Sequence, residues 1–294
     1  MGTSTEPRWA RSGPKPVVTA EFAEWTADDG QRVAVVARYP DSGDDLPVVV
    51  LCHGLGGSQH GYAALGTHLA SHGYAVLHPR FADAGESSLA LLFDPKYWLS
   101  RVTRVHAVIN SLAGRQHLPI RLRADNVIVA GHSFGAYTAQ LLVGTRLFEV
   151  GPDFAHRTHP AVAGGILLSP QGSGDRGLTP HSWDGVDLPL LVVTATHDRG
   201  ARGEGLEWRR EPFDRARSRL RHLAVVRGGD HQLGGLPEPE PTGDAEIRTA
   251  VAAVVTGFAD RVHGDRSAGD WLAAGPFPTL LDHAHREDTA CPTT

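Results

Sequence analysis

Short runs of apolar residues that alternate with helical segments most constrain how this chain can fold. Each run is continuous, which is typical of strands buried on both faces of a parallel sheet. Apolar residues recur at helical spacing over residues 98–112 and 247–258. The alternation predicts an α/β fold with a doubly wound, mostly parallel sheet and helices on both faces. The predicted strands cover residues 48–52, 75–78, 127–130, 165–168, 190–194 and 223–226.

A hairpin is expected ahead of these strands. Residues 19–26 and 32–39 have strand character, and Asp28-Asp29-Gly30 between them is a turn signal. Because the sequence has no internal repeat, one domain is the simplest organisation. We expect a disordered tail over residues 1–16, the α/β domain over residues 17–264 and a C-terminal extension over residues 265–294.

Composition narrows the class of protein. The formal net charge of −5 gives no general attraction to nucleic acid or anionic lipid. The two cysteines, Cys52 and Cys291, do not form the even framework of a disulfide-stapled secreted domain. Residues 1–16 lack the apolar segment of a secretory signal, and no run of 18 apolar residues predicts a membrane span. We therefore expect a cytoplasmic protein.

The strongest chemical signal is Gly131-His132-Ser133-Phe134-Gly135, which lies between a predicted strand and a helix-forming run. A Gly-x-Ser-x-Gly sequence in this setting is typical of a nucleophile elbow, where a sharp turn exposes the serine hydroxyl. The glycines on either side are needed where a Cβ would collide with a neighbouring element. Ser133 is therefore the candidate nucleophile, and an inert serine in a glycine-rich turn is the alternative.

Two later residues complete a candidate triad with Ser133. A serine hydroxyl needs a base to take its proton and an acid to orient that base. Asp198 and His231 each follow a predicted strand, in the chain order of serine, acid and histidine that this elbow requires. Asp230 is a rival acid, but its position next to His231 in sequence makes it a poor partner for Nδ1 of that ring. We expect it to shape the loop.

A glycine-rich loop after the first buried strand is a candidate oxyanion hole. In His53-Gly54-Leu55-Gly56-Gly57 the small residues allow the chain to turn close to the elbow. The backbone N–H groups of Leu55 and Phe134 are the expected donors. His53 is a candidate substrate contact. A phosphate-binding loop is the alternative, but neither a dinucleotide nor a Walker motif is completed here.

Several of these motifs together resemble the α/β-hydrolase superfamily over residues 48–263. They are His53-Gly54, Gly131-His132-Ser133-Phe134-Gly135, Thr196-His197-Asp198 and Gly229-Asp230-His231. Residues 53–79, 168–172 and 228–235 are similar to bacterial dienelactone-hydrolase-like esterases, which are related to platelet-activating-factor acetylhydrolase and chlorophyllase-type enzymes. The resemblance implies an eight-stranded sheet, ester hydrolysis and no cofactor. The chain differs from true dienelactone hydrolases, whose nucleophile is a cysteine at the position where this chain has Ser133.

Two long connections, residues 145–163 and 171–187, are candidate pocket walls. Their aromatic residues Phe148, Phe154 and Trp183 are expected either to contact substrate or to pack on the sheet. An arginine-rich stretch over residues 199–221 predicts either attraction of an anionic substrate or, as we favour, a solvated helix face with acidic partners. The sequence Asp282-His283-Ala284-His285 matches no zinc spacing, so no metal is expected.

Three functions are compatible with these observations. The favoured one is a serine hydrolase that cleaves a carboxylic ester, lactone or thioester through an acyl-enzyme, with a small-molecule ester as its partner and no cofactor. The second uses the same triad for transfer or cyclisation in a biosynthetic pathway, as an acyltransferase, thioesterase or cyclase. The third is a non-catalytic binding protein on the same scaffold. The sequence does not determine the oligomeric state.

Overall fold

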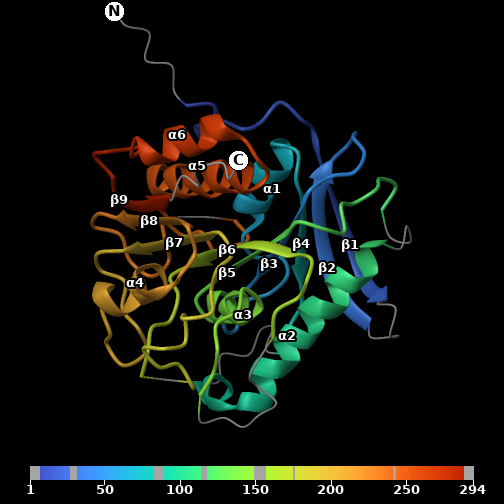
Figure 1. The fold of residues 1–294 in the computed structure, drawn as a ribbon. Helices are drawn as coiled ribbons and strands as arrows, with labels where there is room; N and C mark the ends of the chain where they lie inside the picture. The colour runs from blue at the N-terminus through green and yellow to red at the C-terminus, as the bar shows by residue number, and fades with distance from the viewer. Residues whose placement is uncertain are drawn as a thin grey trace, which may run out of the picture.

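Nine strands form one mixed sheet at the centre of the protein (Figure 1). The computed structural model describes residues 7–26, 32–82, 89–113, 118–148, 157–174, 176–240 and 243–287. The strand order across the sheet is β1-β2-β4-β3-β5-β6-β7-β8-β9. The strands are β1 (Val17–Thr26), β2 (Arg32–Pro40), β3 (Val48–Cys52), β4 (Ala75–Pro79), β5 (Val127–His132), β6 (Val162–Leu168), β7 (Leu190–Ala195), β8 (Leu220–Val226) and β9 (Leu281–Glu287).

The six central strands lie in the order β4-β3-β5-β6-β7-β8, and all neighbours among them pair in parallel, as the apolar runs predicted. Every residue of β3, β4, β5 and β7 is buried. Continuous apolar runs suit these strands because helices cover both of their faces. The expected hairpin is present as the antiparallel pair β1 and β2, and its turn residues lie outside the described part of the chain.

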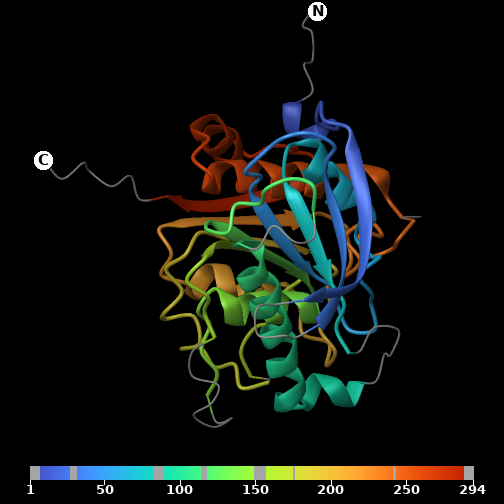
Figure 2. The same ribbon diagram turned by 90° about the vertical axis from the view of Figure 1, so that its right-hand side faces the viewer.

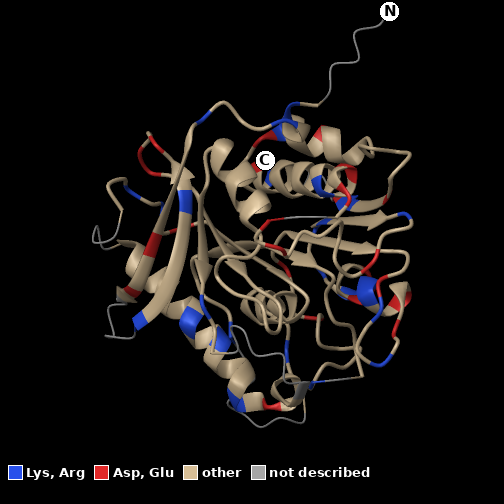
Figure 3. Cartoon of the chain, turned by 180° about the vertical axis from the view of Figure 1, so that it is seen from behind, with Lys and Arg blue, Asp and Glu red and all other residues tan. Residues whose placement is uncertain are grey.

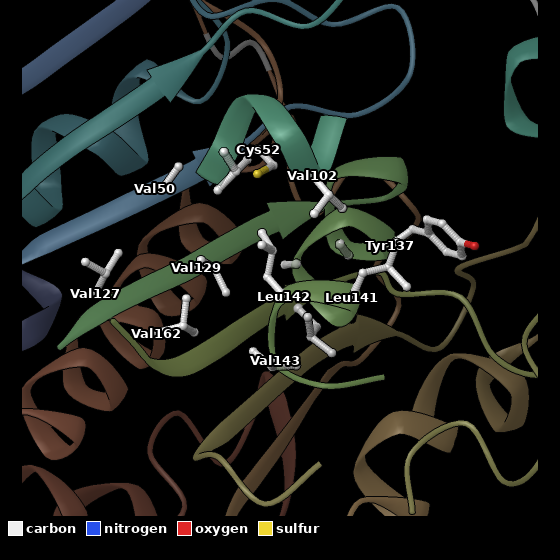
Figure 4. Packing of buried hydrophobic residues seen from close by; sticks show 14 of the residues in the cluster. Val50, Cys52, Val102, Val127, Val129, Tyr137, Leu141, Leu142, Val143 and Val162 are labelled. Atoms are coloured by element: carbon white, nitrogen blue, oxygen red, sulfur yellow. The ribbon is translucent and has the colours of Figure 1, made fainter. Parts of the chain in front are cut away.

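Helices cover the sheet on both sides. One face carries α2 (Pro95–Asn110), α3 (Phe134–Leu142) and α4 (Leu206–Arg215), and the other carries α1 (Ala63–Ser71), α5 (Ala245–Val262) and α6 (Arg266–Ala273). Short 3-10 turns are η1 (Arg8–Ala10), η2 (Leu89–Phe93) and η3 (Ser111–Ala113). In Figure 4, Leu142 of α3 and Val102 of α2 pack against Val50 and Val129 of the sheet. This core holds α3, and thus the elbow in front of it, against β3 and β5.

The expected strand number was wrong, because the described residues contain a ninth strand, β9, in the segment expected to be an extension. β9 pairs antiparallel with the whole of β8, from Leu220 with Glu287 to Val226 with Leu281 (Figure 2). Its sequence, Leu-Asp-His-Ala-His-Arg-Glu, is mostly polar because an edge strand is partly exposed. Such a strand has no apolar run from which it could be predicted.

The N-terminal segment also differs from expectation where it is described. Trp9 is buried, its ring lies 4.5 Å from that of Trp271, and its indole N–H donates to Asp260 at 2.8 Å. Arg8 also hydrogen-bonds Asp265. The segment from residue 7 is therefore anchored on α5 and α6 by one large aromatic side chain. Residues 1–6 and 288–294 lie outside the described part.

Charged side chains lie mainly on the outer helices, the edges and the loops, whereas the central strands are almost free of them (Figure 3). In the described ranges we find no helix that combines the length and the apolar character needed to cross a bilayer.

Candidate active site

The turn between β5 and α3 has the conformation of a strained elbow. Ser133 has φ of 53° and ψ of −120°, a region that non-glycine residues rarely adopt. A Cβ on Gly131 would lie 2.2 Å from the carbonyl oxygen of Gly135, and one on Gly135 would lie 2.0 Å from that of Cys52. Both glycines are therefore needed for the tight approach of β3, β5 and α3. The turn leaves the Ser133 side chain half-buried at the carboxyl edge of the sheet.

Asp198 follows β7 at the same edge and is fully buried. Its Oδ2 accepts a hydrogen bond from Thr194 at 2.9 Å, and its Oδ1 accepts one from Arg209 Nε at 3.0 Å. Burial alone would raise the pKa of Asp198, but the hydrogen bond from His231 and the charge of Arg209 outweigh burial and lower it. The carboxylate is therefore ionised and held in one orientation.

His231 lies on the loop after β8 and is directed at Asp198. Its Nδ1 is 2.8 Å from Asp198 Oδ1, and its side chain is 29 % exposed. Because a carboxylate only accepts, Nδ1 carries the proton and Nε2 is left to act on a neighbouring group. Asp230 instead accepts a hydrogen bond from the backbone N–H of Gln232 at 2.9 Å, which is a loop-shaping contact.

Ser133 and His231 both line one pocket of about 220 Å³. Among the hydrogen bonds of the described residues, none joins the Ser133 hydroxyl to the His231 ring, so the shared pocket is what brings these two together. Hydrogen bonds between a catalytic hydroxyl and its base are often long in ligand-free sites and shorten when substrate binds. The pocket is lined by Leu55, Leu92, Ser133, Gln171, Arg176, Arg199, Gly200, Ala201, Trp208, Arg209 and His231.

The two expected oxyanion donors lie beside this pocket. Leu55 lines it, and Phe134 follows Ser133 as the first residue of α3. Within the described part of the chain, neither backbone N–H makes a hydrogen bond to another residue. Buried Arg101 supports both segments, because it hydrogen-bonds the carbonyl oxygen of His53 and lies 4.7 Å from the centre of the Phe134 ring.

A chain of hydrogen bonds that sequence reasoning missed joins three loops of the site. The Gly54 N–H donates to the Tyr62 hydroxyl at 3.3 Å, which lies 3.0 Å from His132 Nδ1. His132 Nε2 lies 2.7 Å from the carbonyl oxygen of His231. Since a carbonyl only accepts, His132 donates from Nε2 and accepts from Tyr62. Burial lowers the pKa of His132 to about 3, so the ring stays neutral.

The structure corrects both candidate substrate contacts. His53 is buried and does not line the pocket; its Nε2 instead accepts the backbone N–H of Phe81 at 3.2 Å. Trp183 is also fully buried, and its indole N–H donates to Gln140 Oε1 at 2.8 Å in the core below α3. It therefore packs in the hydrophobic core beside α3, neither as a pocket wall nor as an exposed aromatic on the sheet edge. Phe148 is exposed away from the pocket, and Phe154 lies outside the described residues.

The arginine-rich stretch divides into two groups. Arg210 and Arg215 form surface ion pairs with Asp214 and Glu211 on α4, as the favoured interpretation predicted. Arg199 and Arg209 line the pocket, which the same interpretation did not predict. Buried Arg176 joins them from another loop. The sequence alone could not separate these two groups, because it does not show which arginine side chains face the pocket and which face solvent.

The histidine cluster near the C-terminus belongs to β9 and lies away from the pocket. His285 stacks on His222 of β8 with ring centres 5.8 Å apart. In the part of the chain that is described, no three His, Cys, Asp or Glu side chains are grouped so that they could hold a metal ion.

Comparison with known proteins agrees with part of the sequence resemblance. No curated protein matches the chain. Residues 32–96, from β2 into α2, match the model of a family described as platelet-activating factor acetylhydrolase, isoform II. The matched stretch contains the loop with His53 and Leu55 and ends before Ser133. The chain is thus confirmed, over residues 32–96, to resemble the platelet-activating factor acetylhydrolases, which indicates a hydrolase of the esterase type.

Proposed function

We propose that this protein is a serine hydrolase of the α/β-hydrolase fold that cleaves a small carboxylic ester through an acyl-enzyme. The observation that carries the proposal is the strained turn at Ser133, which lines one pocket with a histidine bonded to a buried carboxylate. The coarse esterase assignment has separate support from the family match.

In the proposed reaction one imidazole takes up and gives back a proton in each of two steps. His231 Nε2 takes the proton of the Ser133 hydroxyl as the oxygen attacks the ester carbonyl, and Asp198 stabilises the imidazolium that forms. The N–H groups of Leu55 and Phe134 hold the oxyanion. His231 then protonates the leaving alcohol. In the second step it deprotonates the attacking water and returns that proton to the Ser133 oxygen as the acid is released.

The pocket supports a small substrate. Its volume of about 220 Å³ lies below the 300 Å³ or more of sites for drug-sized ligands. Leu55, Leu92 and Trp208 give it an apolar part that suits a short acyl chain. An acetyl group, as in the name of the matched family, is of this size.

Turnover of p-nitrophenyl acetate tests the hydrolase, with wild type compared with Ser133→Ala. The variant is expected to lose at least about 10³-fold in kcat. The control is Ser100→Ala on α2, whose hydroxyl bonds, among the described residues, only the carbonyl oxygen of Tyr97. This variant should keep wild-type activity. A fluorophosphonate should label wild type and not Ser133→Ala. Wild-type protein that is folded but neither labelled nor active would identify the scaffold as a binding protein.

The same machinery could transfer the acyl group to an acceptor other than water. No contact of the described residues favours this alternative over hydrolysis. Product analysis with added alcohols or amines separates the two functions. Release of acid in preference to a new ester or amide supports the hydrolase.

A further inference from the structure

Arg209 is a buried arginine at the centre of the candidate site that the proposed mechanism does not use. It lies on α4 and is 2 % exposed. Its Nε donates to Asp198 Oδ1 at 3.0 Å, and the same oxygen accepts from His231 Nδ1 at 2.8 Å. One carboxylate oxygen is therefore shared between a permanent cation and the proposed base.

The remaining donors of Arg209 are bonded to the backbone. One terminal nitrogen donates to the carbonyl oxygens of Ser169 and Pro170, both at 2.9 Å, and the other donates to that of Arg199 at 2.9 Å. These carbonyls lie on the loops after β6 and β7. The guanidinium thus fixes those loops around Asp198 and uses its donors within the protein, which suits a positioning residue better than a substrate anchor.

The second terminal nitrogen of Arg209 also lies 3.3 Å from His231 Nδ1. Both nitrogens carry protons, because Nδ1 donates to Asp198 and a guanidinium only donates. The contact therefore places a fixed positive charge against the edge of the imidazole. Protonation of the ring would bring a second cation to the same carboxylate, which a nearby like charge opposes.

Other charged or titratable groups face His231 from the surrounding elements. From the elbow, the His132 ring lies 4.8 Å away, and it is neutral because burial lowers its pKa. Asp230, on the same loop as His231, is exposed and bonded to the backbone. Arg176 and Arg199 line the same pocket. The negative charge of Glu204 favours the protonated form of Arg209. Among the described residues, only Asp198 and Arg209 are full charges within hydrogen-bond range of the ring.

We propose that Arg209 is a positioning residue: its donors hold the Asp198 carboxylate in place, and its fixed charge offsets that of Asp198 and opposes a second positive charge on the His231 ring. The inference rests on the proposed function, since it concerns the base of that reaction. It predicts that loss of the positive charge of Arg209 and loss of the several hydrogen bonds of its planar guanidinium change activity in different ways.

The test is the pH dependence of kcat/KM on p-nitrophenyl acetate for three forms of the enzyme. In Arg209→Met, which removes the charge, the acidic limb should move about one pH unit or more toward higher pH, and the plateau should fall. In Arg209→Lys, which keeps the charge and loses the planar guanidinium, the plateau should fall while the limb stays within a few tenths of a unit. Arg210→Met, whose arginine pairs with Asp214 on the surface, is the matched control and should follow wild type.

An acidic limb that stays in place in Arg209→Met while the plateau falls would overturn the proposal, because Arg209 would then be only structural. Arg209→Gln replaces Arg209→Met if the latter does not fold, since an amide can still reach the backbone carbonyls. Proton uptake by the His231 ring, followed by NMR in these variants, should move to higher pH together with the limb. This readout needs no turnover, so it separates a failure of this inference from a failure of the proposed hydrolase.

Discussion

His132 donates a hydrogen bond of 2.7 Å to the carbonyl oxygen of His231, so the residue before the elbow serine holds the backbone of the proposed base. The other ring nitrogen of His132 accepts from Tyr62, which in turn accepts from the N–H of Gly54. The loop proposed to hold the oxyanion, the turn at Ser133 and the loop of His231 are thereby connected through buried polar groups. Such networks are rigid when every member has a partner and costly when one member is removed.

Removal of the Tyr62 hydroxyl should weaken this connection. Tyr62→Phe leaves the Gly54 N–H and His132 Nδ1 without their partner, which is expected to cost about 1–3 kcal/mol of unfolding free energy. Because the His231 loop loses part of its support, kcat should also fall, by about tenfold, which is below the roughly hundredfold that a misplacement of 1 Å can cost. Urea unfolding and ester turnover measure the two effects.

Tyr74→Phe is the matched control for Tyr62→Phe. Like Tyr62, Tyr74 is a buried tyrosine with a bonded hydroxyl, which donates to Asp260 at 2.8 Å, but Tyr74 precedes β4 and so lies at the opposite end of the parallel strands. This variant should lose stability and keep wild-type kcat. Equal losses of kcat in both variants would show that the Tyr62 contact has no special role in the site.

The glycine after the elbow should tolerate no side chain. In Gly135→Ala the new Cβ would lie 2.0 Å from the backbone oxygen of Cys52, and backbone cannot move aside cheaply. We expect a loss of about 3 kcal/mol or more in unfolding free energy. Urea unfolding checks this value, and a variant as stable as wild type would contradict the close approach of α3 to β3.

Gly54→Ala is the control for that substitution. Its Cβ would be 3.4 Å from the nearest atom, the His132 oxygen, and 3.6 Å from Ser133 Cβ, which are ordinary contacts. This variant should fold with a loss below about 1 kcal/mol. Its kcat/KM should nevertheless fall, because the new methyl group would lie beside Ser133, the proposed nucleophile.

Acid should destabilise the protein well before its carboxylates are protonated. Burial lowers the pKa of His222 to about 4 and of His132 to about 3, while both take up protons near pH 6.5 in the unfolded chain. The unfolded state therefore binds more protons between these values, and stability falls as pH drops below about 6.5. Urea unfolding at pH 7.5 and 5.0 should show this loss.

His222→Phe should reduce the acid sensitivity. The ring of His222 faces Phe258, and its Nε2 has no hydrogen-bond partner among the described residues, so an aromatic ring can replace it. Between pH 7.5 and 5.0 the variant should lose about 1–2 kcal/mol less stability than wild type. His181→Phe, at an exposed position, is the control and should behave as wild type. A loss in His222→Phe as large as in wild type would refute the burial argument.

The charge of the pocket should favour anionic esters. Arg176, Arg199 and Arg209 line it, and none of the described residues that line it is acidic. For a monoester of a short dicarboxylic acid, kcat/KM should exceed that of the neutral ester of equal length, and the difference should shrink as salt is raised. Arg199→Gln should reduce the preference, whereas Arg210→Gln, on the outer side of α4, should not. If kcat/KM had the same salt dependence for the charged and the neutral ester, the predicted preference for anionic esters would be refuted.

The sequence alone predicted eight of the nine strands of the described sheet and the candidate triad, because both can be read from the order of residues along the chain. Eight strands were predictable since their apolar runs or alternation are read directly, and all eight are present. Ser133, Asp198 and His231 stood out because each follows a strand in a fixed chain order, and parallel strands bring such positions to one edge.

Only the tertiary structure decided which other residues reach the site. Trp183 looked like a pocket wall until burial placed it in the core, and β9 looked like a tail because an edge strand needs no apolar run. Arg209 could not be told from Arg210 in sequence, yet one faces Asp198 and the other faces solvent. Neighbouring residues on a helix point about 100° apart, so the direction in which α4 packs on the sheet decides which guanidinium is buried.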